Sequence, residues 1–338
     1  MKKAIFIGNE SLINRVFSAK TQTLLMKEAV FPYGSKVFSQ DELNETDFQE
    51  IQFLFSTWGM CELTEEQIRL FFPKLECVFY AAGSVQRFAR PFLKCGVRVF
   101  SAWAANAVPV AEFTLAQIIL ASKGYFSRMV LPLSNESVAQ KKSEKTAEAF
   151  PGNYEITVGI IGAGMIGRLV IEKIQLVLEN IRILVFDPFL PEDKAAELGV
   201  EKCDLPTLFS QSDVISNHLA NNAQTKGMLN GVLFDQMKPL AVFINTGRGA
   251  QVVEADLISA LKDVPTRAAA LDVTFPEPPA EDSPFYEMRN VFLTPHMAGS
   301  SGNEVHRMAE YMLEECKRYM SDQPMRYEVT EKMLETMA

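Results

Sequence analysis

The chain has 338 residues, which exceeds the roughly 250–300 residues at which one hydrophobic core usually stops growing, so two domains are expected. Hydrophobic residues make up 48% of the chain and charged residues 22%, a balance that excludes disordered, collagen-like and membrane-embedded classes. The net charge of −9 opposes the phosphate backbone of nucleic acids and argues against them as partners.

The first hundred residues alternate short β-rich runs with helical stretches such as Glu65–Phe72. Parallel strands need crossover connections, usually helices, so this alternation predicts a parallel sheet covered on both faces. The apolar run Ala4–Ile7 is too short for a signal-peptide core, and no apolar span of 18 residues is expected, which predicts a cytoplasmic protein. The predicted strands are Lys3–Gly8, Val37–Phe38, Ile51–Phe55, Cys77–Ala81 and Val97–Phe100.

The middle of the chain begins with a long predicted helix, Ala107–Lys123, whose apolar positions form a wide stripe. Pro109 would occupy the first turn of this helix. Leu131–Asn153 carries a charged run and no sustained apolar period, so it is interpreted as a solvated connection.

A second alternating unit follows and predicts a doubly wound α/β domain. The amphipathic segment Asn303–Met320 lies beyond its last strand and is expected to return to the first domain. The predicted division is therefore a domain of residues 1–101 and 300–338, and a domain of residues 102–299. The predicted elements are strands Ile156–Ile161, Ile181–Phe186, Asp213–Asn217, Ala241–Asn245, Ala268–Asp272 and Val291–Leu293, with helices Ile166–Leu178, Glu192–Leu198 and Glu254–Lys262.

A glycine motif lies between the first strand and first helix of this second unit. Gly162, Gly164 and Gly167 form G-x-G-x-x-G, a pattern that in this context cradles a dinucleotide pyrophosphate at a helix N-terminus. Asp187 follows twenty residues after Gly167, at the end of the next strand, where a carboxylate can bind ribose hydroxyls. No arginine follows Asp187 immediately, so NAD is preferred over NADP. The alternative is a simple glycine turn.

Three ionisable residues come at the ends of successive predicted strands: Arg248, Glu277 and His296. Ligand sites of open α/β sheets gather at these carboxyl ends. Arg248 can bind a carboxylate through two N–H donors, and histidine exchanges protons near neutral pH. The alternatives are a solvated loop arginine and a structural histidine. The five cysteines lie far apart, which predicts reduced, mostly buried thiols and no metal site.

These motifs, in this order, resemble the D-isomer-specific 2-hydroxyacid dehydrogenases, which include phosphoglycerate, glycerate, glyoxylate and D-lactate dehydrogenases. The resemblance covers nearly the whole chain. It implies an α/β fold of two Rossmann-like domains, with an NAD-binding doubly wound parallel sheet inserted into a flavodoxin-like substrate domain. It is strongest in the segments Asn106–Glu112, Val158–Gly167, Asp213–Asn230, Phe234–Gly249, Asp272–Pro278 and Thr294–Gly299.

The resemblance also implies roles for individual residues. Arg248 would bind the substrate carboxylate and carbonyl, His296 would be the general acid/base, and Glu277 would orient the imidazole and favour its protonated form. The backbone of Ala82, Gly83 and Ser84, together with Arg248 and His296, would bind the substrate. The cofactor NAD would contact Gly162, Gly164, Met165, Ile166, Gly167, Asp187, His218, Ala220, Thr246, Gly247, Arg248, Asp272 and His296.

The sequence departs from the family pattern at two places. Ala220 stands where the family usually has proline, and Gln86 and Arg87 replace the usual acidic residues. Arg87 and Arg90 could contact a second anionic group on the substrate, or could be solvated. Trp58 could line the substrate pocket, or could make a contact between domains.

The implied activity is NAD-dependent interconversion of a D-2-hydroxy acid and its 2-keto acid, in a homodimer. Two other functions stay open at this point. One is a catalytically silent NAD-binding sensor or scaffold on the same fold, since fold alone does not fix function. The other is a formate dehydrogenase-like enzyme, although that group has glutamine where Glu277 stands. The sequence names neither the substrate nor the direction of the reaction.

Overall fold

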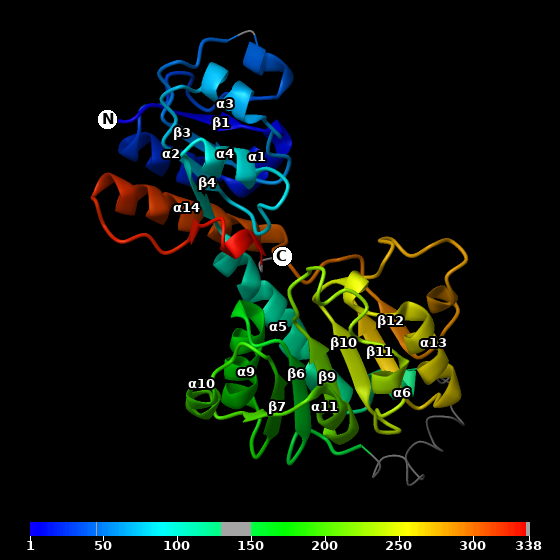
Figure 1. Cartoon of the computed structure of the whole chain (residues 1–338). Coiled ribbons are helices and arrows are strands. Elements are labelled where there is room, and N and C mark those ends of the chain that lie inside the picture. Colours follow the sequence, from blue (N-terminus) through cyan, green and yellow to red (C-terminus); the bar gives the residue numbers. More distant parts are fainter. Residues whose placement is uncertain (45, 130–149, 336–338) are drawn as a thin grey trace. The chain divides into compact units, whose positions relative to one another are not determined.

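The structure is a computed structural model, and it describes residues 1–44, 46–129 and 150–335 (Figure 1). The chain forms two compact units. Unit 1 combines Met1–Ala107 with Ser300–Ala338, and unit 2 is the continuous segment Val108–Gly299. Each unit contains its own sheet with helices on both faces; the sheet of unit 2 is parallel throughout and that of unit 1 is parallel except for one edge strand, which confirms the predicted fold class.

The sheet of unit 1 has the strand order β13-β5-β4-β3-β1-β2. The first five strands of the chain are parallel to one another and lie in the flavodoxin-like order 2-1-3-4-5. The sixth strand, β13, is antiparallel to β5 and comes from the end of the chain. The strands are β1 (Ala4–Ile7), β2 (Val37–Phe38), β3 (Phe53–Ser56), β4 (Cys77–Tyr80), β5 (Arg98–Ser101) and β13 (Glu328–Val329).

A row of phenylalanines crosses this sheet and accounts for much of its core. Phe6, Phe55, Phe79 and Phe100 are cross-strand partners on β1, β3, β4 and β5, and all are fully buried. The rings of Phe55 and Phe79 stack with centroids 4.9 Å apart, and those of Phe79 and Phe100 with centroids 5.1 Å apart. Directly opposed aromatic pairs stabilise a sheet and specify its register.

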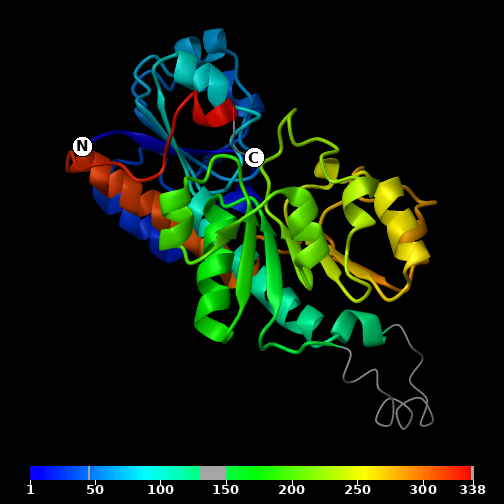
Figure 2. The same ribbon diagram turned by 60° about the horizontal axis from the view of Figure 1, so that its bottom comes forward.

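Two layers of helices cover the sheet of unit 1. Figure 2 shows α14 with the blue helices α1 and α2 on one side, and the cyan helices α3 and α4 on the other. The C-terminal helix α14 therefore belongs to unit 1, where it packs on α1 and α2. The helices are α1 (Glu10–Val16), α2 (Ala19–Glu28), α3 (Glu65–Phe71), α4 (Ala89–Lys94) and α14 (Val305–Met320), with short 3-10 turns at Asp41–Asn44, Gly302–Glu304 and Met333–Glu335.

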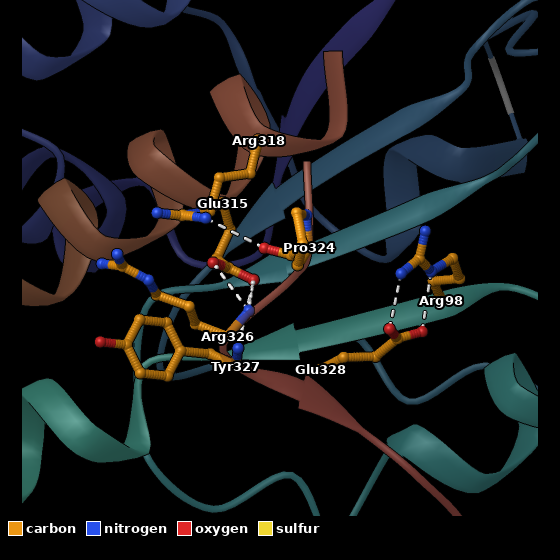
Figure 3. Close-up of polar contacts among 7 residues, drawn as sticks. All are labelled: Arg98, Glu315, Arg318, Pro324, Arg326, Tyr327 and Glu328. Carbon is orange, nitrogen blue, oxygen red and sulfur yellow. Dashed lines mark hydrogen bonds and ion pairs between the residues drawn. The ribbon is translucent and has the colours of Figure 1, made fainter. Parts of the chain in front are cut away.

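The C-terminal strand β13 is held by charged groups on both sides (Figure 3). The carboxylate of Glu315 on α14 is fully buried and accepts hydrogen bonds from the backbone N–H groups of Arg326 and Tyr327. The guanidinium of Arg98 on β5 donates to both carboxylate oxygens of Glu328, at 2.7 and 2.6 Å. These bonds turn the chain back after α14 and attach β13 to the edge of the sheet.

The sheet of unit 2 is parallel throughout, with the order β12-β11-β10-β9-β6-β7-β8. From β6 the chain runs outward through β7 and β8, and then returns to β9 on the other side of β6. The carboxyl ends of β6 and β9 thus form the topological switch point at which such sheets bind ligands. The strands are β6 (Thr157–Ile161), β7 (Arg182–Phe186), β8 (Glu201–Lys202), β9 (Val214–Asn217), β10 (Val242–Asn245), β11 (Ala268–Leu271) and β12 (Val291–Leu293).

The strands of unit 2 are apolar on both faces because helices cover both. On β10, for example, Val242 and Ile244 pack into one core cluster and Phe243 packs into the other. Uninterrupted apolar runs of this kind are typical of buried parallel strands. The helices are α5 (Trp103–Ser122), whose residues up to Ala107 belong to unit 1, α6 (Tyr125–Met129), α9 (Met165–Val177), α10 (Glu192–Glu197), α11 (Leu205–Gln211), α12 (Gly231–Phe234) and α13 (Glu254–Asp263), with 3-10 turns at Gly249–Gln251 and Pro284–Tyr286.

Two expectations about the long helix α5 were wrong. The helix begins at Trp103 rather than Ala107, so Pro109 lies inside it and not in its first turn. The second expectation was that the chain has no apolar span of 18 residues. Among the described residues, α5 is the one helix long and apolar enough to cross a membrane. Half of the apolar stretch of this helix is buried, and Ala111 and Ile118 pack into the core of unit 2. Core helices meet the same length and composition criteria, so this feature is weak evidence for a membrane span.

The predicted connection Leu131–Asn153 falls mostly outside the described residues, which resume at residue 150. The cysteines are all free thiols. Cys61, Cys77 and Cys316 are buried, and Cys95 and Cys203 are partly buried.

Candidate active site

The glycine loop joins β6 to α9 at the switch point of unit 2. Gly162 has a φ of +91°, and a Cβ there would lie 2.8 Å from the carbonyl oxygen of His218. A Cβ on Gly167 would lie 2.0 Å from the carbonyl oxygen of Gly162, so helix and loop pack too closely for a side chain. A Cβ on Gly164 would meet nothing within 4 Å. The loop is therefore tight at its two ends and open in the middle.

Helix α9 begins beside this opening without a side-chain cap, because Gly164 is its N-cap residue. The first N–H groups of Met165, Ile166 and Gly167 lack acceptors within the helix, and the helix dipole places partial positive charge there. Uncapped N–H donors facing open space suit a phosphate group.

The carboxylate of Asp187 lies at the end of β7 and contacts the glycine loop. Its Oδ2 accepts a hydrogen bond from the Ala163 N–H at 2.7 Å, and its Oδ1 accepts one from Phe189 N–H at 2.8 Å. The carbonyl of Ala163 accepts a further bond from Nε of Arg168 at 2.8 Å. Each carboxylate oxygen keeps a free lone pair for a ligand hydroxyl.

The segment after β9 forms the facing side of the switch point. The His218 ring is buried and its Nε2 lies 2.9 Å from Oγ of Ser216, while Nδ1 has no partner among the described residues. Burial lowers the pKa of His218 to about 3, so its imidazole is neutral. The carbonyl of Ala220 accepts hydrogen bonds from Thr225 and Gln251.

Arg248 lies in the loop after β10, together with Thr246 and Gly247. Its Nη1 donates to the Gly247 carbonyl at 2.7 Å, and Thr246 Oγ1 lies 3.0 Å from Thr114 Oγ1. Burial lowers the pKa of Arg248, while the nearby charge of Glu277 acts in the opposite direction. The guanidinium remains charged, since arginine is effectively never deprotonated in proteins. It thus offers positive charge in a partly desolvated position.

His296 and Glu277 form a hydrogen-bonded pair, with Nδ1 of His296 2.6 Å from Oε1 of Glu277. The side chains are 47% and 39% exposed, so the pair faces open space. A carboxylate only accepts hydrogen bonds, so Nδ1 carries the hydrogen and Nε2 is the nitrogen left for a ligand. His296 follows β12 and Glu277 follows β11, as the sequence predicted for their strand-end positions.

Asp272 comes directly after β11 and is almost fully buried. Its Oδ1 accepts hydrogen bonds from Thr294 Oγ1 at 2.5 Å and from Met297 N–H at 2.8 Å, and its Oδ2 accepts one from Ala298 N–H at 2.9 Å. The contacts of this carboxylate are thus to the loop that carries His296. A cofactor contact of Asp272 stays a prediction.

In unit 1 the predicted substrate-binding backbone follows β4. Ser101 Oγ donates to the carbonyls of Ala82 and Gly83, at 2.9 and 2.6 Å. Among the described residues, the N–H groups of Gly83 and Ser84 donate no hydrogen bond. This leaves the loop with donors that could meet an anion.

The arginines and the tryptophan of unit 1 have partners within that unit. Arg87 forms an ion pair with Glu62 and its side chain is 87% exposed, as expected of a solvated arginine. Arg90 donates to Gln86 and to the Leu334 carbonyl. Trp58 packs partly buried against the core of unit 1.

Three buried amides near Arg248 were missed by sequence reasoning. Asn217, Asn245 and Gln251 are connected by hydrogen bonds at the carboxyl ends of β9 and β10. Asn217 and Asn245 lie in segments that follow the family pattern and Gln251 lies outside them, but no role was predicted for any of the three. The one available signal is a polar residue at the end of an apolar strand, which applies to Asn217 and Asn245. The structure shows no cluster of metal-ligating side chains among the described residues.

The geometry of unit 2 fits a dinucleotide. Gly164 leaves space for a pyrophosphate, the N-terminus of α9 supplies donors, and Asp187 offers carboxylate oxygens on the same side. Arg248, Glu277 and His296 come from the ends of three neighbouring strands of the same sheet. The ligand site and the ionisable pair thus share the carboxyl edge of one sheet.

Comparison with curated proteins identifies relatives. The chain is 34% identical to the D-3-phosphoglycerate dehydrogenase of Archaeoglobus fulgidus over 209 residues, which are 61% of this chain and 38% of that protein. It is 31% identical to the Bacillus subtilis D-3-phosphoglycerate dehydrogenase over 68% of this chain and 42% of that protein. The matched region spans about two fifths of the length of these relatives.

Solved structures share the fold over nearly the whole chain. The D-mandelate dehydrogenase of Rhodotorula graminis superposes with a TM-score of 0.79 at 18% identity, covering 98% of both chains. The D-lactate dehydrogenase of Escherichia coli superposes with a TM-score of 0.64 at 22% identity, covering 98% of this chain and all of the other. Residues 126–298, just over half of the chain, match the family model of the D-isomer specific 2-hydroxyacid dehydrogenase NAD binding domain. The chain therefore belongs to the D-isomer specific 2-hydroxyacid dehydrogenase family.

Proposed function

We propose that this chain is an NAD-dependent oxidoreductase that interconverts a D-2-hydroxy acid and its 2-keto acid. The observation that carries the proposal is the 2.6 Å bond between Nδ1 of His296 and Oε1 of Glu277, at the same sheet edge as Arg248 and the glycine loop. This combination supplies a proton, a carboxylate-binding cation and a dinucleotide site. The D configuration of the product follows from the family.

The cofactor would bind across the switch point of unit 2. The N–H groups at the start of α9 would hold the pyrophosphate, Asp187 the ribose hydroxyls, and the backbone of His218 and Ala220 the adenosine side. A carboxylate at the ribose position repels a 2′-phosphate, which favours NAD over NADP. Thr246, Gly247, Arg248, Asp272 and His296 would surround the nicotinamide end.

When bound, NADH supplies the hydride that reduces the 2-carbon of the keto acid. His296 would complete the reduction by donating a proton from Nε2 to the carbonyl oxygen as negative charge develops there. Glu277 holds Nδ1, so the ring is fixed in the orientation that leaves Nε2 free. In the reverse reaction the neutral ring accepts the hydroxyl proton at the same atom.

Arg248 would bind the substrate carboxylate and stabilise charge on the reacting oxygen. Its guanidinium is partly desolvated, which strengthens its interaction with an anion. In unit 1, the N–H groups of Gly83 and Ser84 would bind a substrate carboxylate.

We also propose the domain functions and the oligomeric state that the family implies. Residues 1–101 and 300–338 would form the substrate domain, residues 102–299 the NAD-binding domain, and two chains would form a homodimer. Light scattering on the purified chain tests the dimer, and a mass of one chain would contradict it.

The experiment that tests the activity is NADH oxidation against a panel of 2-keto acids: glyoxylate, pyruvate, hydroxypyruvate, 2-ketoglutarate, and branched and aromatic examples. His296→Ala is the matched variant, because it removes the proton donor and leaves the pyrophosphate and ribose parts of the cofactor site. We expect turnover with at least one acid, and a fall of on the order of 100-fold or more in kcat for His296→Ala.

Binding of NADH without turnover on any acid would contradict the dehydrogenase and favour an NAD-binding sensor. Release of carbon dioxide from formate would favour formate chemistry instead.

A further inference from the structure

Three primary amides lie buried at the carboxyl edge of the unit 2 sheet. The side chains of Asn217, Asn245 and Gln251 are 0%, 1% and 0% exposed. Burying an amide is costly unless its hydrogen bonds are made, so such a group is retained only where its bonds are satisfied. Asn217 ends β9, Asn245 ends β10, and Gln251 ends the turn that follows Arg248.

The amides bond to one another first. Both hydrogens of the Asn217 Nδ2 amide are used, one toward Asn245 Oδ1 at 3.0 Å and one toward Gln251 Oε1 at 2.6 Å. Asn217 Oδ1 accepts the N–H of Leu219 at 3.2 Å. Asn217 thereby links two neighbouring strand ends through side chains alone.

Gln251 is the joint between two loops. Its Nε2 donates to the carbonyls of Leu219 and Ala220, at 2.7 and 3.0 Å. Its Oε1 accepts from Asn217 and from the N–H of Arg248, the latter at 3.3 Å. Both donors and both acceptor positions of this amide are filled, which fixes its orientation.

The backbone of Arg248 is consequently held on both sides. Its N–H bonds to Gln251, and its carbonyl accepts from Asn245 Nδ2 at 3.2 Å. The preceding N–H, of Gly247, donates to Asn245 Oδ1 at 3.0 Å. A Cβ on Gly247 would come within 3.1 Å of both Asn217 Nδ2 and Gln251 Oε1, so the loop lies directly on the amides.

We propose that Gln251, bonded to Asn217 and supported by Asn245, is a positioning residue that fixes the Arg248 backbone and couples it to the Leu219–Ala220 segment. This inference rests on the proposed role of Arg248 in binding the substrate carboxylate. A side chain on a fixed backbone has fewer accessible orientations. The Arg248 guanidinium is therefore preorganised before the substrate binds. Gln251 also bonds to the carbonyls of Leu219 and Ala220, so a shift of the Arg248 backbone would also move this segment on the cofactor side of the switch point.

The test is Gln251→Met, which keeps the length of the side chain and removes all its hydrogen bonds. We expect the KM for the best keto acid of the panel to rise on the order of 10- to 100-fold. The dissociation constant for NADH should rise by a smaller factor, because backbone at Leu219 and Ala220 is released. The matched control is Asn290→Leu, since Asn290 is a buried amide of the same unit that donates to the carbonyls of Leu261 and Arg267. It should lower the Tm and leave the KM unchanged.

A double variant separates positioning from stability. In Asn217→Leu/Gln251→Met the two bonded amides are replaced together by apolar groups. This removes the Asn217 N–H that Gln251→Met alone leaves unpaired, but it also takes the acceptor from the Leu219 N–H. The KM should stay high whatever the Tm of the double variant, because the Arg248 N–H still lacks the Gln251 amide. A KM that returns toward the parent value would overturn the proposal.

A cycle with Arg248→Lys separates this inference from the proposed function. Lysine keeps the charge and loses the forked donors, so Arg248→Lys should raise the KM by itself. Adding Gln251→Met to it should then cost much less than it does in the parent chain, because the residue it positions is gone. An unchanged KM in Arg248→Lys would contradict the role of Arg248. A raised KM in Arg248→Lys would overturn the positioning role alone if Gln251→Met raises the KM by the same factor in both backgrounds, or does not raise it in the parent chain.

Discussion

Asp272 holds the chain on both sides of His296. The backbone N–H of His296 donates to the Asp272 carbonyl at 3.1 Å, and the Asp272 carboxylate accepts from Thr294 before it and from Met297 and Ala298 after it. His296 has a φ of +50°, a left-handed conformation that non-glycine residues rarely adopt. Such a conformation persists where surrounding bonds enforce it, and here Asp272 supplies them.

We expect Asp272→Asn to loosen the loop that carries His296. The asparagine keeps the shape but turns an NH2 group toward N–H or O–H donors, so at least one buried donor loses its acceptor. The free energy of unfolding should fall by about 1–3 kcal/mol, and kcat should fall by about 10-fold or more. Urea unfolding and steady-state kinetics measure the two effects.

Asp204→Asn is the matched control for this change. Asp204 caps α11 by accepting the N–H of Thr207, a role in which asparagine is nearly equivalent. The loop argument fails if Asp272→Asn behaves like this control in both measurements.

The left-handed backbone of His296 predicts a difference in stability between two variants that both lose activity, His296→Gly and His296→Ala. His296→Gly removes the Cβ that makes this φ unfavourable, whereas His296→Ala keeps it. Both variants lose the imidazole and should show the same large fall in kcat. The glycine variant should be more stable than the alanine variant by about 1 kcal/mol, seen as a higher Tm in calorimetry. Equal or reversed Tm values would show that the loop is not strained at this position.

The glycine loop offers a matched pair of alanine substitutions. Gly164→Ala places a methyl group in open space, so the protein should fold with an unchanged Tm and bind NADH more weakly. Gly167→Ala places a methyl group against the Gly162 carbonyl and should destabilise the fold by about 1–3 kcal/mol. Calorimetry and NADH fluorescence titration measure both effects. Unchanged NADH affinity in Gly164→Ala would place the pyrophosphate elsewhere.

Acid sensitivity should depend on His218. Its pKa is about 3 in the folded chain against an ordinary value of 6.5, so between these pH values the unfolded chain binds a proton that the folded chain does not. Stability from this group is therefore present above pH 6.5 and is lost as the pH falls toward 3, by at most about 1.4 kcal/mol per pH unit. His218→Gln should flatten this part of the profile in urea unfolding. His306→Gln, on α14 of unit 1, is the control, and an equal effect of the two variants would contradict the assignment.

Local patterns were sufficient to predict the parts of the site that short-range sequence determines. The glycine motif of 162–167 follows β6 and runs into the first turn of α9, and Asp187 follows β7, because strand, turn and helix signals there are contiguous in the chain. Glu277 and His296 were placed at the ends of β11 and β12 by the apolar runs before them. Their contact could be expected from the shared edge of a parallel sheet, and not from either residue alone.

Features that depend on tertiary contacts could not be predicted in this way. Strand β13 has two residues and forms because Glu315 and Arg98 hold it against β5. Arg98 lies 230 residues before its partner Glu328 in the sequence. The bonds of Gln251 join loops that only the folded sheet brings together. Pro109 was placed in a first turn because Pro is common there, but tertiary packing extends α5 beyond it on the N-terminal side.

The pairing of β13 with β5 has a consequence for biosynthesis. Unit 2 is one continuous segment, Val108–Gly299, and all its strands are available once that segment has left the ribosome. Unit 1 needs residues from both sides of that segment, because Val99 and Phe100 pair with Val329 and Glu328. Domains fold as units during synthesis, so the inserted unit should reach its native state first. Until Glu328 and Val329 have left the ribosome, the edge of β5 stays uncovered, and it is open to wrong pairing in the nascent chain.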